Sequence, residues 1–205
     1  MVAYRPVEPS ARVQIPAPAP STVTVPGLDM GVRMSFQIID GKSYVFKDED
    51  LWALAEMETH PDVVKWNLSV RTCDKSEMYE LFKKAIRKLP MEKDQIFLVG
   101  KLNGKVAGFL GILCETKCLM RVGNVGITVH PDYWNTGFGT QLLKAGVARA
   151  QEEGLMKLEA ETLFSNKAMI RIAEKVGFKV ESVRKKLIKK SGKREDIALL
   201  SMLLK

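Results

Sequence analysis

The sequence predicts one α/β (α+β) domain, built as a mixed sheet of six to seven strands with helices on both faces. Segments rich in β-branched residues alternate with segments whose apolar residues recur at helical spacing. Of the 205 residues, 46% are apolar and 27% are charged, which is typical of a globular chain. A chain of this length can bury a sizeable core within a single domain.

Residues 1–33 are expected to form a disordered leader, and residues 34–205 the folded domain. Six of the nine prolines lie before residue 27, and large apolar side chains are few there. Such a segment buries too little apolar surface to offset the entropy lost on ordering. Either the leader tethers a partner, or the chain begins at Met30 or Met34 and the leader has no role.

Three cysteines and the absence of a long apolar run indicate a cytoplasmic protein. No run of about 18 apolar residues is available to span a membrane, and prolines interrupt every candidate signal peptide. An odd, small number of cysteines does not suit a secreted disulfide framework. Cys114 and Cys118 are four residues apart, but no second pair completes a zinc site, so we expect no metal.

Turn and cap residues mark the elements of the first half. The pair Asn103-Gly104 predicts a tight hairpin, Asp48 offers a helix N-cap, and Pro90 ends a helix. The expected elements are strands at 36–39 and 44–46, helices at 48–59 and 75–89, and strands at 95–100 and 105–113.

Glycines mark helix ends in the second half. Gly154 and Gly177 each follow a segment with helical spacing of apolar residues, as C-terminal caps do. The expected elements are a strand at 122–129, a helix at 138–153, a strand at 155–162, a helix through 169–176, and strands at 178–188 and 195–204.

The most informative segment, 127–140, is a strand, a short loop and a helix that opens on Gly137 and Gly139. Glycines allow a tight turn, and the free N–H groups of a first helical turn attract anions. A Walker A loop would need a lysine after the glycines, but Thr140 follows. A dinucleotide fold would need a third small residue near Leu142. A cradle for the pyrophosphate of coenzyme A remains.

On these residues the sequence resembles the GNAT superfamily of acetyl-CoA-dependent N-acetyltransferases. The resemblance spans residues 36–204 and includes the strand ending Ile127-Thr128-Val129, the loop ending Gly137-Phe138-Gly139, and Asn166 followed by Gly177-Phe178. Trp134 stands where the family has Arg or Gln, a departure from its pattern. The Tyr133-Trp134 pair, His60-Pro61-Asp62 and Lys175-Val176-Gly177-Phe178 are similar to the branch that modifies N-termini of ribosomal proteins.

The resemblance implies a splayed sheet in which one strand pairs its backbone with the pantetheine arm, and a backbone N–H near Val129 that holds the thioester oxygen. It also implies that Asn166 contacts the cofactor arm, although Asn is equally a good helix N-cap. The residues expected to bind acetyl-CoA are Ile127, Thr128, Val129, Asn135, Thr136, Gly137, Phe138, Gly139, Thr140 and Asn166.

Acetyl transfer needs a neutral amine, so a base must remove a proton from the ammonium. Glu161 matches the glutamate base of the ribosomal-protein branch, while Glu159 on the same strand side and His130 remain alternatives. The family often carries a tyrosine as general acid seven residues after the asparagine, where this chain has Ala173. A water or another side chain would then protonate the leaving thiolate.

Residues 178–194 carry eight basic side chains and one acidic side chain, within a chain of net charge +8. This segment either docks to an acidic partner such as ribosomal RNA, or forms a solvated hairpin whose lysines prevent edge pairing, which we prefer. Trp52, Met57, Trp66 and Met78 either line the acceptor site or belong to the core.

We therefore expect an enzyme that transfers the acetyl group of acetyl-CoA to a primary amine, namely the N-terminal α-amino group of a protein or peptide, ribosomal proteins included. A small amine such as a polyamine is the first alternative, and a non-catalytic acyl-CoA sensor the second. A monomer and a homodimer both remain open.

Overall fold

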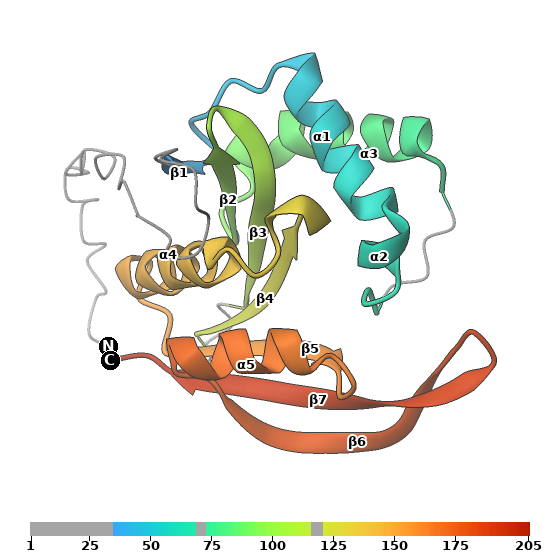
Figure 1. Cartoon of the computed structure of the whole chain (residues 1–205). Coiled ribbons are helices and arrows are strands. Elements are labelled where there is room, and N and C mark those ends of the chain that lie inside the picture. The colour runs from blue at the N-terminus through green and yellow to red at the C-terminus, as the bar shows by residue number, and fades with distance from the viewer. Residues whose placement is uncertain (1–34, 69–72, 116–120) are drawn as a thin grey trace, which may run out of the picture.

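The computed structural model describes residues 35–68, 73–115 and 121–205 (Figure 1). The expected leader lies outside these residues. Within them, seven strands form one sheet in the order β1-β2-β3-β4-β5-β7-β6. The strands are β1 (Phe36–Asp40), β2 (Gln95–Leu102), β3 (Lys105–Glu115), β4 (Val122–Val129), β5 (Lys157–Leu163), β6 (Lys179–Lys190) and β7 (Lys193–Leu203). The helices are α1 (Asp48–Thr59), α2 (Pro61–Val64), α3 (Lys75–Lys88), α4 (Phe138–Glu152) and α5 (Lys167–Val176), with short 3₁₀ turns η1 (Leu89–Met91) and η2 (Pro131–Tyr133).

Helices cover both faces of the sheet, as the sequence predicts, and each face has its own core. Along β2 the side chains alternate between the two cores. Ile96 and Leu98 pack with α4 and α5, whereas Phe97 and Val99 pack with α1 and α3. The α4/α5 face and the α1/α3 face are therefore separated by the strands themselves.

Two predicted hairpins are confirmed, each closed by a turn whose two central residues have positive φ. Asn103 and Gly104 (φ 50° and 81°) join β2 to β3, and Ser191 and Gly192 (φ 47° and 79°) join β6 to β7. Such paired positive φ values match the twist of the flanking strands.

The chain between β1 and α1 corrects two predictions. The strand expected at 44–46 is absent, and the chain there runs without regular structure. The Tyr44 hydroxyl instead donates to Asp50 at 2.8 Å, which draws the segment to the start of α1. Asp48 is the first helical residue rather than the cap, which is Lys47, and the Lys47 N–H donates to Asp50 at 3.1 Å. The short helix α2 was also not predicted.

A buried ion pair fixes the start of α1 on the sheet. Lys101 of β2 lies 3.0 Å from the Asp50 carboxylate, and both side chains are largely buried. Burial raises the pKa of Asp50, but hydrogen bonds from Lys47, Lys101 and Tyr44 outweigh this and hold the pKa below its ordinary value. With its first turn held in this way, α1 brings its last turn over β4.

The sheet splays apart between β4 and β5. These strands pair in parallel only at residues 122–124 with residues 157–159, and beyond them they diverge (Figure 1). The other edge of β4 stays paired with β3, and the other edge of β5 stays paired with β7. The divergence confirms the splayed sheet that the family resemblance implies.

Phe138, the first residue of α4, lies in a groove made by two glycines. A Cβ on Gly100 would lie 2.5 Å from the Phe138 ring, and one on Gly108 would lie 2.9 Å from it and 2.7 Å from the Thr128 carbonyl oxygen. The fully buried ring also stacks on Phe36, with centroids 5.6 Å apart. These contacts fix the N-terminus of α4 against the sheet.

We predict that Gly108→Ala destabilises the protein by about 1–3 kcal/mol, because the added methyl group meets backbone as well as the buried ring. Gly111→Ala, in the same strand, is the matched control, since its Cβ would meet only Phe97 at 4.0 Å. Urea unfolding followed by circular dichroism measures both. Equal urea midpoints for the two variants would contradict the close packing of Phe138 against Gly108.

Candidate active site

The N-terminus of α4 presents free backbone donors. Gly137 precedes the helix with φ of +83°, and Asn135 also has positive φ, at +61°. Within the residues that the structure describes, the N–H groups of Gly139 and Thr140 have no protein acceptor. Together with the positive end of the helix dipole, these donors form an anion site.

Glycine at position 139 is not required by packing within the protein. A Cβ there would lie 3.6 Å from Val129 and 3.7 Å from Ile172, which are ordinary contact distances. The space it leaves lies between β4 and α5, beside the free N–H groups. A slender group bound at the anion site can therefore pass from the helix toward the sheet.

Trp134 closes the loop between β4 and α4. Its indole N–H donates to the Val129 carbonyl oxygen at 2.8 Å, so the side chain folds back onto the end of β4. The sequence showed only that Trp134 departs from the family pattern; this contact was missed.

The main chain of β4 points unpaired groups into the splay. The His130 N–H donates to Ala107 of β3 at 2.9 Å. Because alternate residues of an antiparallel strand face opposite edges, Val129 and Ile127 turn their N–H and C=O groups away from β3, toward β5. Pairing with β5 has ended at residue 124, so both N–H groups and the Ile127 carbonyl oxygen are available to a ligand, whereas the Val129 carbonyl oxygen already accepts from Trp134.

A pocket of about 310 Å³ lies where the strands part, and it is lined by Asn124, Val125, Gly126, Glu159, Ala160 and Glu161. Leu158 and Ala160 pack into the α4/α5 core, so Glu159 and Glu161 project toward the opposite face, as predicted. Arg184 of β6 lies 3.0 Å from Glu161, and Lys157 lies 2.7 Å from Glu159.

Glu58, in the last turn of α1, joins this face of the sheet. The Thr128 hydroxyl donates to one carboxylate oxygen at 2.7 Å, and the Asn67 amide donates to the other at 3.1 Å. Sequence reasoning missed Glu58. One signal was present, because an acid in the last turn of a helix faces the negative end of the helix dipole.

Comparison with known proteins decides the family. Residues 45–179, more than half of the chain, match the family model described as an acetyltransferase (GNAT) domain. The chain belongs to the GNAT acetyltransferase family. Members of this family bind acetyl-CoA.

Individual relatives agree with this assignment. The acetyltransferase is 29% identical over 144 residues to a [ribosomal protein bS18]-alanine N-acetyltransferase of Haemophilus influenzae, covering 66% of this chain and 96% of the relative. Among solved structures, the fold is similar to a ribosomal-protein-alanine N-acetyltransferase from Brucella melitensis (TM-score 0.64, 20% identity, 82% of this chain and 99% of that chain). It is also similar to a spermidine N-acetyltransferase from Vibrio cholerae in complex with CoA and spermine (TM-score 0.68, 16% identity, 82% and 95%).

Asn166 caps a helix in this acetyltransferase. Its side-chain oxygen accepts from the Met169 N–H at 3.2 Å, and its amide donates to Thr162 at 3.3 Å. The capping role is therefore confirmed, and the cofactor role stays a prediction. Ala173 is 1% exposed in the core, so the family's usual tyrosine position carries no proton donor.

The two histidines of the acetyltransferase form matching turns. In His60-Pro61-Asp62 and in His130-Pro131-Asp132, the histidine Nδ1 accepts from the aspartate N–H, at 3.2 and 3.3 Å. The two rings lie 5.7 Å apart. With its Nδ1 engaged in this way, His130 shapes the loop after β4.

Trp52, Met57, Trp66 and Met78, for which the sequence leaves both an acceptor site and the core open, separate into two groups. Met57 and Met78 are buried in the α1/α3 core. Trp52 stacks on Tyr79 with centroids 4.3 Å apart, and Trp66 lies just beyond α2 under the Lys65 ammonium. For the two methionines the core interpretation is therefore correct.

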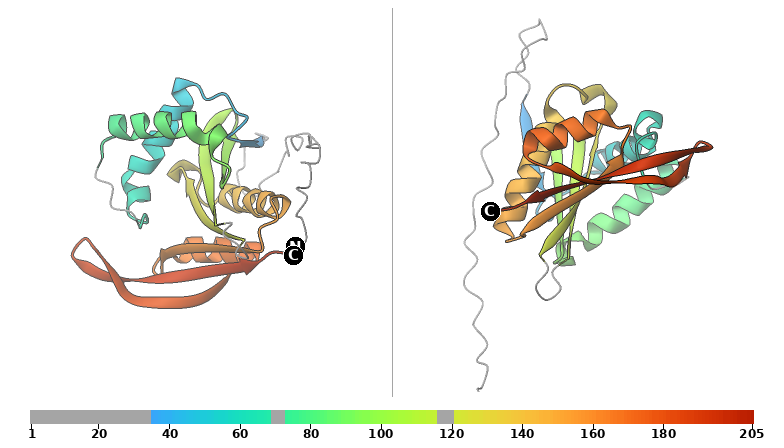
Figure 2. Two further views of the ribbon diagram at one scale, coloured as in Figure 1. Left: turned by 180° about the vertical axis from the view of Figure 1, so that it is seen from behind. Right: turned by 90° about the horizontal axis from the view of Figure 1, so that it is seen from below.

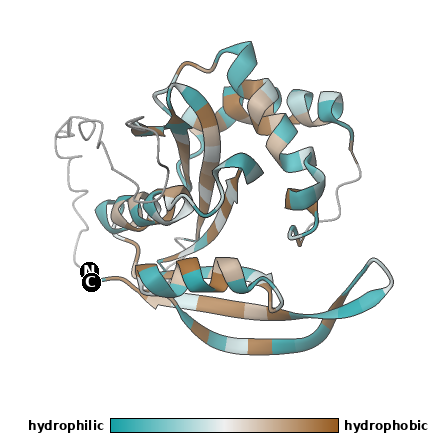
Figure 3. Ribbon diagram, viewed as in Figure 1, coloured by the Kyte–Doolittle hydropathy of each residue, from teal (hydrophilic) through white to brown (hydrophobic). Residues whose placement is uncertain are grey.

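The basic β6–β7 hairpin reaches across to α2 (Figures 1 and 2). Lys190 at its tip donates to the carbonyl oxygens of Val64, at 2.8 Å, and of Asn67. Burial lowers the pKa of Lys190. Lys185 is paired with Asp196 at 3.0 Å, and polar residues dominate the hairpin tip (Figure 3). The hairpin thus encloses one side of the α1/α3 face of the sheet.

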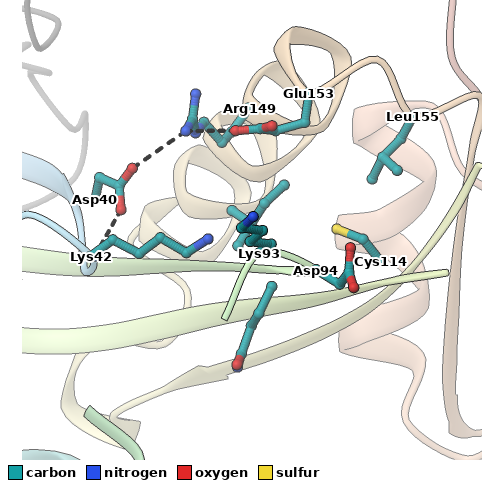
Figure 4. Close-up of a pocket in the computed structure, with 10 residues that line it drawn as sticks. Asp40, Lys42, Lys93, Asp94, Cys114, Arg149, Glu153 and Leu155 are labelled. Carbon is teal, nitrogen blue, oxygen red and sulfur yellow. Dashed lines mark hydrogen bonds and ion pairs between the residues drawn. The ribbon is translucent and has the colours of Figure 1, made fainter. Parts of the chain in front are cut away.

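A second, smaller pocket of about 50 Å³ lies at the far end of α4 (Figure 4). Arg149 there lies 3.6 Å from Asp40 and 2.8 Å from Glu153. Arg149 follows Gly139 of the anion site by ten residues of α4, a separation of about 15 Å at 1.5 Å per residue. Burial raises the pKa of Cys114 in this pocket. Cys118, four residues after Cys114 in the sequence, lies outside the described residues.

No helix in the described parts of the chain is long and apolar enough to cross a membrane. No cluster of three or more metal-binding side chains occurs there either.

We predict that Thr140→Glu weakens CoA binding at least about tenfold relative to Thr140→Gln, because the new carboxylate repels the diphosphate. The same charge favours the helix N-terminus, so the melting temperature of Thr140→Glu should not be lower. Isothermal titration calorimetry with CoA and thermal unfolding measure the two effects. Equal dissociation constants would place the diphosphate elsewhere.

Proposed function

We propose that this protein transfers the acetyl group of acetyl-CoA to a primary amine, namely the N-terminal α-amino group of a protein. The observation that carries the proposal is the continuity of the anion site at α4 with the unpaired main chain of β4. One ligand could then place its diphosphate at the start of α4 and its thioester between β4 and β5.

Residues of both elements would hold acetyl-CoA. The backbone of Asn135 to Thr140 would bind the diphosphate, and the backbone of Ile127, Thr128 and Val129 would run beside the pantetheine arm, with Asn166 near the arm. When bound, acetyl-CoA supplies a thioester carbonyl and a thiolate leaving group. The Val129 N–H, which points into the splay, would donate to the carbonyl oxygen and stabilise its developing charge.

Glu161 is the proposed base. It lies at the mouth of the splay on the α1/α3 face, where an acceptor amine can reach the carbonyl carbon. Its carboxylate takes one proton from the ammonium, which frees the nitrogen lone pair for attack. Glu159 shares the face and remains the alternative, and each carboxylate is paired with a cation, Glu159 with Lys157 and Glu161 with Arg184.

The departing thiolate takes its proton from water or from another side chain, because Ala173 cannot donate one, and the attacking nitrogen gives its second proton to that same group as the amide forms. The thiol reference pKa of about 8.5 makes the thiolate a fair leaving group even without a donor. The same alanine motivates the second alternative, a non-catalytic acyl-CoA sensor.

The Haemophilus relative supports a ribosomal protein as acceptor, and the basic hairpin would suit docking to an acidic ribosomal surface. Carboxylates on the acceptor face and the likeness to a spermidine N-acetyltransferase fold favour a polyamine as the alternative acceptor.

An acceptor panel tests the proposal. The full chain is incubated with acetyl-CoA and with peptides having free N-termini, blocked peptides bearing lysine, or polyamines, and products are identified by mass spectrometry. Acetylation of free peptide N-termini is expected. Acetylation of polyamines alone would support the alternative acceptor, and binding of acetyl-CoA without transfer would support the sensor.

We predict that Glu161→Gln lowers kcat about 10²–10⁴-fold with little change in acetyl-CoA affinity, because the amide cannot take the proton. Glu159→Gln is the matched control, since it removes the same charge from the same strand face. Full activity of Glu161→Gln at every pH would remove Glu161 from the mechanism, and a loss confined to Glu159→Gln would transfer the role.

A further inference from the structure

We propose that Glu58 binds the ammonium group of the acceptor and thereby selects cationic amines. This inference rests on the proposed function and adds to it a second acidic residue, carried by a helix rather than by the sheet. The two carboxylates approach the splay from different arms, with Glu58 over β4 and Glu161 on β5.

Glu58 lies beside the reacting end of β4. Its partner Thr128 directly precedes Val129, whose N–H is proposed to hold the thioester oxygen. Ile127 and Val129 pack toward the α4/α5 core, so the Thr128 side chain points to the opposite face. Glu58 therefore lies on the face from which an amine must approach.

The Glu58 carboxylate is held but not saturated. Among the described residues, one donor binds each oxygen, Thr128 at 2.7 Å and Asn67 at 3.1 Å. A carboxylate offers about four lone-pair positions, so each oxygen can accept one further hydrogen bond. Two fixed oxygens with free acceptor capacity suit an ammonium, which has three donors.

The charge of Glu58 distinguishes it from its neighbours. Glu56, Glu159 and Glu161 each lie within 3.0 Å of a lysine or arginine nitrogen. In the described structure, the hydrogen-bond partners of Glu58 are both neutral. Its negative charge is therefore available to attract a cation from outside the protein.

The position of Glu58 is unfavourable for the helix itself. The last turn of α1 contains no basic residue, and a carboxylate there faces the negative end of the helix dipole. A bound ammonium would relieve this repulsion. The stability of α1 does not explain the placement; the hydrogen bonds from Thr128 and Asn67 hold the carboxylate there, and a bound cation would add to them.

The hairpin tip supports the same residue through Asn67. The side-chain amide of Asn67 donates to Glu58, and the main-chain carbonyl oxygen of Asn67 accepts from Lys190. Lys190 directs its ammonium at main-chain carbonyl oxygens of Val64 and Asn67. The contact of Lys190 with the main chain of Asn67 thus helps to fix the Asn67 side chain, which in turn orients the Glu58 carboxylate.

The two acids then have different roles. Glu58 attracts and positions the ammonium, and Glu161 takes the proton as one N–H bond breaks and the nitrogen lone pair becomes free. Loss of Glu58 should weaken acceptor binding, whereas loss of Glu161 should slow the chemical step.

The test compares Glu58→Gln with Glu56→Gln, using the best acceptor from the panel. We expect Glu58→Gln to raise KM for the amine about 10–100-fold, the equivalent of one charged hydrogen bond, with kcat lowered less than about threefold. Acetyl-CoA affinity should be unchanged. Glu56→Gln removes the same charge from the same helix, but from a carboxylate paired with Lys75, and should leave KM unchanged.

Salt dependence supplies a readout that a structural role would not move. KM of the unmodified protein should rise with ionic strength, because salt screens the attraction between Glu58 and the ammonium, and KM of Glu58→Gln should rise less. If Glu58→Gln does not fold, Thr128→Val is the second variant. It keeps the charge of Glu58 but removes the hydroxyl that holds one carboxylate oxygen in place, so the less well positioned carboxylate should raise KM for the amine about 3–10-fold.

Several outcomes would overturn the inference. These are an unchanged KM in folded Glu58→Gln, a fall in kcat alone, or an equal loss of acetyl-CoA affinity. Failure of the unmodified protein to acetylate any amine would refute the proposed function and, with it, this role of Glu58. That failure is seen before any variant is made, so the two refutations are distinguishable.

Discussion

The divergence of β4 and β5 leaves main-chain hydrogen-bonding groups unpaired in the middle of a sheet. Ordinary sheets pair these groups, since an unsatisfied amide away from water is costly. Here β4 and β5 pair only at residues 122–124 with 157–159 and then diverge, while each stays paired along its other edge, β4 with β3 and β5 with β7. A strand-like ligand, such as a chain of two amides, would restore the missing hydrogen bonds. The 310 Å³ pocket, the anion site at the start of α4 and the face that carries Glu58 all border this gap.

The position of α4 turns the gap into a path. Phe138 is held between Gly100, Gly108 and Phe36, so the free N–H groups of the next residues point to the end of the splay. The glycines in β2 and β3 thus contribute to the anion site although they never touch it. On the other side of the sheet, α1 and the β6–β7 hairpin enclose the face on which Glu58 contacts Thr128. In the proposed function, cofactor and acceptor would therefore approach the same gap from opposite faces.

Local chemistry made much of this predictable from sequence. Asn103-Gly104, Gly137 and Gly177 each need a left-handed backbone, and each was placed correctly. The wrong strand at 44–46 shows the limit, because apolar alternation cannot say whether a neighbour strand is available. Glu58 and Thr128 are 70 residues apart, so their contact depends on how α1 crosses the sheet. The tie between Lys190 and α2 depends on the length and curvature of the hairpin, which no local motif encodes.

Residue-resolved amide hydrogen exchange, with and without CoA, tests the central claim most directly. The account predicts that the N–H groups of Ile127, Val129, Gly139 and Thr140 exchange at least about tenfold more slowly when CoA is saturating, while the hairpin-turn amide of Gly192 is unaffected. Unchanged exchange at all four amides would contradict it, because the ligand would then bind neither in the splay nor at the start of α4.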